Sequence, residues 1–306
     1  MKKTVFLLSV LTMISGQTFA NNMSEINSSA PPGLITPIKS QADYQLLFLG
    51  NSHSAFNDLP GLVATLIETG LPGKSADSEL APGFKFLDER LNDGVTQELL
   101  ESRDWTHVFL QAQKYSSSGL YFYPTVAAEQ WIRRVKTQNG RAILFPEWPR
   151  RGNTEEGQRV HNLHLSISSR ESACVAPIGL AWEESIARYP TLALHAADGN
   201  HSNLSGALLS AYVFYQVTTG RPAAALPYIS AINISADTQK NLRELASFVV
   251  DSNLSACPDL EAAANTAAVD STDERIPALN HWGLLIMILL MMIIGVRMRK
   301  SASHWG

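Results

Sequence analysis

The sequence predicts an α/β protein whose central parallel sheet is covered by helices on both faces. Between residues 43 and 250, apolar segments of strand length alternate with amphipathic segments of helix length, which is the pattern of strand–helix–strand units. The strand segments are apolar at almost every position, as expected for strands that helices cover on both sides. A body of about 210 residues is a common size for one domain.

Four segments are predicted to be strands because they are short and almost wholly apolar. They are "YQLLFLG" (44–50), "THVFLQAQ" (106–113), "RAILFPEW" (141–148) and "ACVAPIGLAW" (173–182). A segment of helix length follows each of them, so the strands should run parallel with crossover helices between them. Functional sites in such sheets form beyond the carboxyl ends of the strands.

The predicted helices carry amphipathic patterns and signals at their ends. They span residues 59–70, 124–140, 159–171, about 182–188 and 202–220. Pro124 stands near the first turn of the second helix and Gly140 past its end, positions that these residue types favour. In the last helix, apolar residues from Leu204 to Tyr215 recur at intervals of three and four, so one face is predicted to enter the core.

The region before the predicted domain has the composition of a leader. Residues 1–20 hold two lysines, a mainly apolar run and the small-ended "TFA", the plan of a secretory signal peptide cleaved after Ala20. Residues 21–42 are rich in Asn, Ser and Pro and are predicted to be flexible. The mature protein is therefore expected to be exported.

The region after the domain is predicted to reach a membrane. Residues 251–275 are small, polar and acidic and read as a linker. In residues 276–300 an uncharged apolar run, 282–296, precedes a basic cluster. The run is short for a span of about 20 residues, although residues 276–281 could extend it. Basic residues after it should stay cytoplasmic with a short tail, 301–306, which leaves the domain periplasmic or at the cell surface and anchored at least transiently.

The same segment carries a second pattern. "IPALNHWG", an apolar stretch and "RMRK" resemble the IPTL-type C-terminal sorting signals of bacterial exosortase systems, with Ala278 where the type member has Thr. This resemblance implies a sorting protease of the exosortase type as a partner, and it says nothing about catalysis.

Charge and cysteine content narrow the classes of function. The net charge is −4. A mildly acidic chain gives no electrostatic reason to expect nucleic-acid binding, which requires a basic patch. No Walker loop or dinucleotide fingerprint is present, so no cofactor is expected. The two cysteines, Cys174 and Cys257, both lie in the exported part, where they could form a disulfide, although Cys174 could also be a buried free thiol.

Three polar residues at predicted strand ends suggest nucleophilic catalysis. Ser52 follows the first strand directly, in "LFLGNSHS", and "ADGNHSNLSG" places Asp198 three residues before His201. A serine becomes a nucleophile when a base takes its proton and a third group orients that base. Each pattern alone is also ordinary turn or helix-cap chemistry, but together they predict a Ser52–His201–Asp198 triad.

These segments resemble blocks of the SGNH (GDSL-like) hydrolase superfamily, a group of flavodoxin-like three-layer α/β esterases, lipases and carbohydrate deacetylases. "LFLGNSHS" resembles the first block, with Asn51 in place of the usual Asp, and "DGNHSNLSG" resembles the last, Asp-x-x-His. "WTHVFLQAQKYS" and "VAPIGLAWEES" resemble segments of a bacterial SGNH subgroup. The resemblance spans residues 44 to about 222.

The resemblance also implies roles for individual residues. Ser52 would attack the acyl carbon, His201 would act as general base and then acid, and Asp198 would orient the imidazole. The oxyanion hole would use the backbone N–H groups of Ser52 and Gly83 and a side chain from the third block. The Gly-x-Asn-Asp of that block is absent, so Gln113 is expected as the side-chain donor. Gln111 is the alternate, or a buried structural amide.

The leading hypothesis is an exported serine esterase that cleaves O-acyl esters, O-acetyl groups on envelope glycans among them. A catalytically silent binding domain and an O-acyltransferase are the alternatives.

His53 is expected at the surface. Trp148 and Arg150 are expected either near the pocket or in ordinary loop packing. His161 and His164 have a spacing that permits a metal pair, but no third ligand is evident, so a solvated face is expected and no metal.

Overall fold

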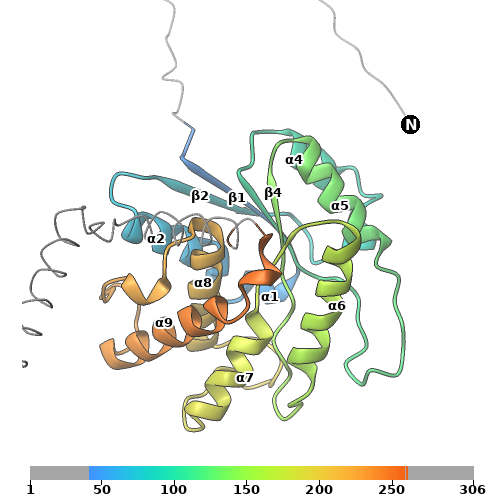
Figure 1. Ribbon diagram of the computed structural model, residues 1–306. Coiled ribbons are helices and arrows are strands. Elements are labelled where there is room, and N and C mark those ends of the chain that lie inside the picture. Colours follow the sequence, from blue (N-terminus) through green and yellow to red (C-terminus); the bar gives the residue numbers. More distant parts are fainter. Residues whose placement is uncertain (1–40, 259, 261–306) are drawn as a thin grey trace, which may run out of the picture. The chain divides into compact units, whose positions relative to one another are not determined.

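The computed structural model describes residues 41–258 and 260, and its centre is one parallel sheet (Figure 1). Its five strands lie in the order β2-β1-β3-β4-β5, and every neighbouring pair is parallel. The strands are β1 Tyr44–Leu49, β2 Ala76–Leu80, β3 His107–Leu110, β4 Arg141–Leu144 and β5 Cys174–Val175. The predicted α/β class is confirmed.

Helices connect the strands and continue beyond the last of them. They are α1 Ser52–Ala55, α2 Leu59–Gly70, α3 Leu87–Arg90, α4 Val95–Glu101, α5 Val126–Thr137, α6 Glu156–Arg170, α7 Ile178–Arg188, α8 Leu204–Thr219 and α9 Ala236–Asp251. Short 3₁₀ helices span Phe56–Asp58, Ala223–Ala225 and Leu254–Ala256.

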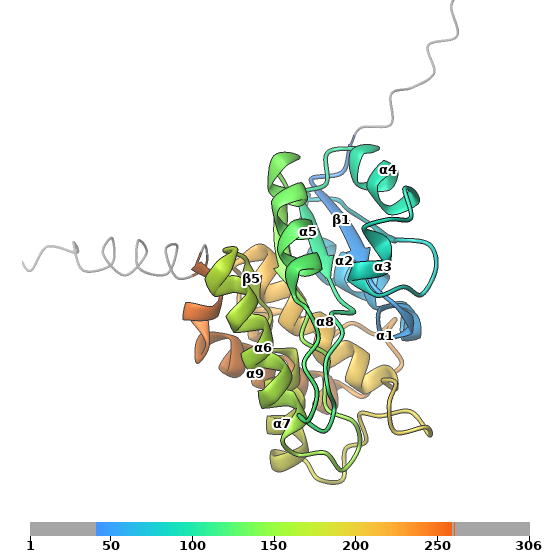
Figure 2. The ribbon, with the colours of Figure 1, turned by 90° about the vertical axis from the view of Figure 1, so that its right-hand side faces the viewer.

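Side chains of the central strands alternate between two separate cores, because successive residues of a strand face opposite sides of a sheet. In β1, Leu46 and Phe48 belong to the core formed with α2, α7, α8 and α9. Leu47 and Leu49 belong to the core formed with α3, α4, α5 and α6. The two sets of helices cover opposite faces of the sheet (Figure 1, Figure 2). The result is a three-layer arrangement that leaves the strand ends accessible.

The strand predictions were right for the centre of the sheet and wrong at its borders. The segment "ADSEL" (76–80) forms β2, which was missed because it is polar and only partly buried at the sheet edge. The predicted strand 173–182 is confined to two residues, since α7 already begins at Ile178, two residues after Ala176. Pro177 between them lacks the N–H that a continuing ladder would need.

The domain extends further toward the C-terminus than expected. Helix α9 runs to Asp251, and Ala256 and Cys257 beyond it are buried. The first residues of the predicted linker 251–275 are therefore part of the packed domain. The predicted signal peptide, leader, sorting signal and tail lie outside the described residues, as does the rest of the linker. Within residues 41–258 and 260, no helix has the length and apolar character needed to cross a membrane.

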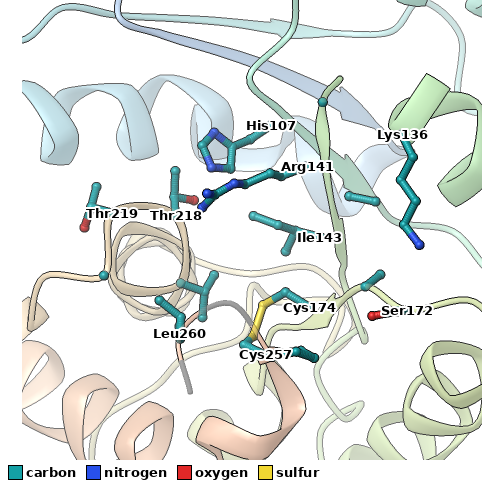
Figure 3. Close-up of a pocket in the computed structure, with 16 residues that line it drawn as sticks. His107, Lys136, Arg141, Ile143, Ser172, Cys174, Thr218, Thr219, Cys257 and Leu260 are labelled. Carbon is teal, nitrogen blue, oxygen red and sulfur yellow. A yellow bond between two sulfur atoms is a disulfide. The ribbon is translucent and has the colours of Figure 1, made fainter. Parts of the chain in front are cut away.

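A disulfide joins Cys174 of β5 to Cys257 after α9, which resolves the alternative left open by the sequence. It borders a cavity of about 350 Å³ at the amino ends of β3, β4 and β5 (Figure 3). His107, Arg141 and Thr218 line the same cavity. This edge of the sheet is opposite to the one at which β1 leads into Ser52.

Removing the disulfide should destabilise the domain without changing its site. The bridge closes a loop with a sequence separation of 83 residues, for which the chain-entropy model gives about 4.5 kcal/mol as an upper figure. We expect Cys174→Ala/Cys257→Ala to lower the free energy of unfolding by about 2–4 kcal/mol in urea titrations. Unchanged stability of the double variant relative to the oxidised parent would contradict this expectation.

Helix α6 carries two histidines that the sequence had placed on a solvated face. His161 and His164 are 2% and 1% exposed, so that prediction is wrong. Burial lowers the pKa of both rings, and of His107 on β3, to about 4. In the described part of the chain, no group of three or more His, Cys, Asp or Glu residues could hold a metal ion.

The buried histidines predict a loss of stability at mildly acidic pH. Between pH 6.5, the usual pKa of histidine, and about pH 4, the unfolded chain binds protons that the folded rings do not. Stability therefore falls as pH falls through this window, by at most about 1.4 kcal/mol per pH unit for each ring. We expect His164→Leu to reduce the difference in unfolding free energy between pH 7 and pH 5 by roughly 2 kcal/mol. Equal differences in parent and variant would exclude His164 as a source.

Candidate active site

Ser52 lies where β1 leads into helix α1. Gly50 and Asn51 separate it from the end of the strand, and Ser52 is the first residue of the helix. A Cβ atom at Gly50 would lie 2.2 Å from Ser54 Oγ and 2.7 Å from Gln111 Oε1, distances that only glycine avoids. The absence of a side chain at position 50 thus lets the chain turn tightly and present the serine at the rim of the sheet.

Asp198 and His201 lie together in the loop before α8. The Asp198 carboxylate accepts hydrogen bonds from the backbone N–H groups of Asn200, at 2.9 Å, and His201, at 3.0 Å. Gly199 allows this tight turn with φ at +72°. Asn57 donates to the Ser202 carbonyl at 2.9 Å, which attaches the loop to the segment that follows Ser52.

The three residues form a continuous hydrogen-bonded series. Ser52 Oγ lies 2.8 Å from His201 Nε2, and His201 Nδ1 lies 2.5 Å from Asp198 Oδ2. An ionised carboxylate can only accept, so Nδ1 carries a proton and Nε2 is free to accept from the serine hydroxyl. The structure therefore brings together the three residues that the sequence selected, in the geometry of a base poised to take the serine proton.

The electrostatics of Asp198 suit this role. The hydrogen bond from His201, together with those from the two backbone N–H groups, holds the pKa of Asp198 well below its usual range. The carboxylate is consequently ionised at any pH at which a histidine can act as base, so it can fix the orientation of the ring and stabilise its protonated form.

The ring of His201 is held between other aromatic groups. Phe56 stacks on it with ring centroids 4.0 Å apart, and the His53 ring lies at 5.1 Å. Trp148 in turn lies 5.0 Å from His53. His53 is only 8% exposed, so the expectation of a surface histidine is wrong. Trp148 is buried as well and takes part in the packing behind the site.

Gln111 is a structural amide beneath the nucleophile. Its Oε1 accepts from the backbone N–H of Asn51 at 2.6 Å and from Ser54 Oγ at 3.1 Å. Its Nε2 donates to the carboxylate of Glu147, which also lies 4.0 Å from His53 Nε2. Both ends of the amide are thus engaged, and Gln111 connects β3, β4 and the start of α1.

Gln113 does not join the triad. Its Nε2 donates to the carbonyls of Lys114, at 2.8 Å, and Pro124, at 3.1 Å. The side chain lines a different cavity, beside α5. Ala112, with φ at +70°, turns the chain between the two glutamines. The Gln113 amide therefore forms hydrogen bonds with backbone carbonyls of the loop that follows. The expected oxyanion role of Gln113 finds no support in this arrangement.

Gly83 is connected to the site through an arginine that the sequence did not indicate. Arg90 of α3 is completely buried and donates from Nη2 to the carbonyls of Gly50, at 2.6 Å, and Gly83, at 2.7 Å. One guanidinium therefore holds the segment of the expected oxyanion glycine against the end of β1. Gly83 itself is exposed, with φ at +75°.

A cavity of about 810 Å³ opens beside the triad. Its wall combines aromatic, charged and amide side chains from the loops at the carboxyl ends of the strands. The lining residues are Asn51, His53, Phe86, Lys114, Tyr115, Tyr123, Glu147, Arg150, Arg151, Asp198, Gly199 and Asn200. Most of these residues belong to no sequence motif. Apart from residues of the triad segments, the sequence had indicated only Arg150 as a possible pocket residue.

Comparison with known proteins agrees with the fold. A DUF4886 family protein from Bacteroides uniformis is similar with a TM-score of 0.55 and 15% identity, over 68% of this chain and 94% of that one. A protein of Slackia heliotrinireducens assigned to the SGNH hydrolases matches with a TM-score of 0.47 and 22% identity, over 57% and 98%. An acetylxylan esterase from Geobacillus stearothermophilus matches at 0.42 and 13%, over 60% and 97%. Searches of family models and of curated proteins found no match.

Proposed function

We propose that this chain is a serine esterase of the SGNH type that hydrolyses O-acyl esters. The observation that carries the proposal is the series Ser52 Oγ, His201 and Asp198, with separations of 2.8 and 2.5 Å. The series lies at the carboxyl end of β1, beside an open cavity, which is the position expected for an active site in a parallel sheet.

The reaction follows from this series in two steps. Ser52 Oγ bonds to the acyl carbon as its proton passes to His201 Nε2, and the carbonyl electron pair moves to the oxygen. The bond to the alcohol oxygen then breaks, and the leaving alcohol takes the proton from His201. In the second step water attacks the acyl-Ser52 ester while His201 takes its proton, and Ser52 leaves with that proton restored. Asp198 stays ionised throughout.

The cavity suggests a polar alcohol part in the substrate. Phe86, Tyr115 and Tyr123 offer ring faces, and the two tyrosines add hydroxyls. Glu147 and Arg150 offer charged hydrogen-bonding groups. This mixture suits a sugar, whose rings stack on aromatic faces while its hydroxyls bond to polar groups. We therefore propose O-acetyl groups on envelope glycans as substrates.

The proposed location depends on segments outside the described residues. The signal-peptide plan of residues 1–20 supports export, and the segment 276–300 supports a membrane anchor and an exosortase-type sorting protease as partners. A periplasmic or cell-surface esterase would meet acylated glycans there.

The contacts within the triad favour an active enzyme over a catalytically silent binding domain. Asn51 and the missing Gly-x-Asn-Asp motivated that alternative, but neither interrupts the contacts from Ser52 to Asp198. Transfer of the acyl group to an alcohol would use the same triad.

The proposal is tested by assaying the purified full-length chain on p-nitrophenyl acetate, longer acyl esters and acetylated xylan. We expect turnover of the short esters, and labelling of Ser52 by a fluorophosphonate in peptide mass spectra. Acyl transfer is scored in the same assay by adding a sugar acceptor. A chain that neither hydrolyses any ester nor is labelled at Ser52 would refute the proposal.

A further inference from the structure

Asn51 carries a carboxamide beside the nucleophile, and its orientation is fixed. Its Oδ1 accepts from the backbone N–H of His53 at 3.0 Å and lies 3.2 Å from Nδ1 of the same residue. Because a backbone N–H can only donate, the oxygen of the amide must face His53 and the nitrogen must face away. Asn51 lines the cavity beside the triad, and within residues 41–258 and 260 its Nδ2 makes no hydrogen bond.

The carboxamides expected to serve an oxyanion hole are engaged elsewhere. Gln111 bonds to Asn51 N–H and Ser54 at one end and to Glu147 at the other. Gln113 donates to two loop carbonyls. The substrate oxyanion that forms when Ser52 attacks an ester would therefore have no side-chain donor from the end of β3.

We propose that Nδ2 of Asn51 donates a hydrogen bond to the oxyanion that forms when Ser52 attacks an ester. This inference rests on the proposed esterase function. Bond formation between Ser52 Oγ and the acyl carbon sends the carbonyl pair to the oxygen, which then accepts from Asn51 and from the N–H of Ser52. As the first residue of α1, Ser52 has no acceptor for that N–H within the helix.

The inference explains the residue that departs from the first block of the family. An aspartate at position 51 could accept from His53 equally well but could not donate to an anion. An asparagine can do both, since its oxygen caps α1, its nitrogen is turned away from His53 and the residue lines the cavity. Asn51, in the first block, would then supply the side-chain donor that the missing Gly-x-Asn-Asp of the third block normally provides.

The test compares two substitutions at position 51. Asn51→Ser keeps an oxygen that can cap the helix but removes the amide, and Asn51→Asp keeps the contacts to His53 but replaces the NH₂ group. A donor directed at developing charge contributes to kcat more than to KM. We expect Asn51→Ser to lower kcat by about 10²–10³-fold, with KM within about threefold, and Asn51→Asp to lower it at least as much.

Control variants separate this role from a structural one. Asn162→Ser on the exposed face of α6 should leave kcat unchanged, and the thermal midpoint of Asn51→Ser should stay close to that of the parent. A parent that hydrolyses esters, loses activity in Ser52→Ala, and keeps its kcat in Asn51→Ser would overturn the inference and leave the esterase standing. So would a large loss in Gln113→Leu or Asn200→Ser without one in Asn51→Ser. A parent inactive on every ester would overturn the proposed function and this inference together.

Discussion

We expect Ser52→Ala to lower the kcat for ester hydrolysis by about 10⁴-fold or more, and His201→Ala to do nearly the same. Ser52 Oγ lies 2.8 Å from His201 Nε2, and neither group can act without the other. The hydroxyl needs the base, and without Ser52 no acyl-enzyme forms for the water that His201 activates to cleave. The double variant should consequently lose little more than either single variant. Steady-state kinetics on p-nitrophenyl acetate measure all three.

Ser54→Ala is the matched control for this prediction. Ser54 lies on the same short helix, but its hydroxyl donates to Gln111 rather than to His201. We expect less than about a tenfold change in kcat for this variant, because only one neutral hydrogen bond is lost. Loss of activity in Ser54→Ala with activity retained in Ser52→Ala would show that the nucleophile had been misassigned.

The triad could be predicted from the sequence because its members follow local patterns. Ser52 stands directly after a wholly apolar strand, and Asp198 and His201 have a spacing that a single turn can close. What joins them across 149 positions is topology. Parallel strands place all their carboxyl ends at one edge of the sheet. The loop between α7 and α8, which carries Asp198 and His201, reaches Ser52 at that edge.

The surroundings of the triad could not be predicted in the same way. Gln113 was expected as the oxyanion donor and Gln111 as the alternate, but Ala112 turns the chain between them with φ at +70°. His53 is buried against Trp148, a contact between distant segments. The edge strand β2 lacks an apolar pattern because it is only partly covered. Each of these features depends on packing between segments rather than on a local pattern.

Arg90 is the clearest case of a residue without a local signal. It follows two acidic residues in "LDER", a sequence typical of a solvated helix. Instead its side chain is completely buried, and the burial lowers the pKa of the guanidinium. Five hydrogen bonds offset the cost of burying this charge, four of them to backbone carbonyls of Gly50 and residues 81–83 and one to Thr96.

We expect Arg90→Met to lower the free energy of unfolding by about 3–5 kcal/mol. The substitution leaves the buried carbonyls of Gly50 and Ala81 without the guanidinium that donates to them, and each buried carbonyl left unpaired costs about 1–3 kcal/mol. Because the Gly50 carbonyl lies at the turn that presents Ser52, kcat should fall as well, even in the folded fraction. Arg90→Lys should recover part of the stability, since an ammonium can donate to some of the carbonyls but lacks the planar fork that reaches all of them.

Arg103→Met is the matched control for Arg90→Met, because it removes an arginine whose side chain is partly exposed. Arg103 pairs with Asp77 and Glu79 on β2, and its side chain is 35% exposed. An ion pair this accessible contributes about 0–1 kcal/mol, so urea titrations should show a small change for Arg103→Met and a large one for Arg90→Met. Equal changes would mean that the carbonyls around Arg90 find other donors or water. In that case the placement of the Gly83 segment against the end of β1 would not depend on the guanidinium.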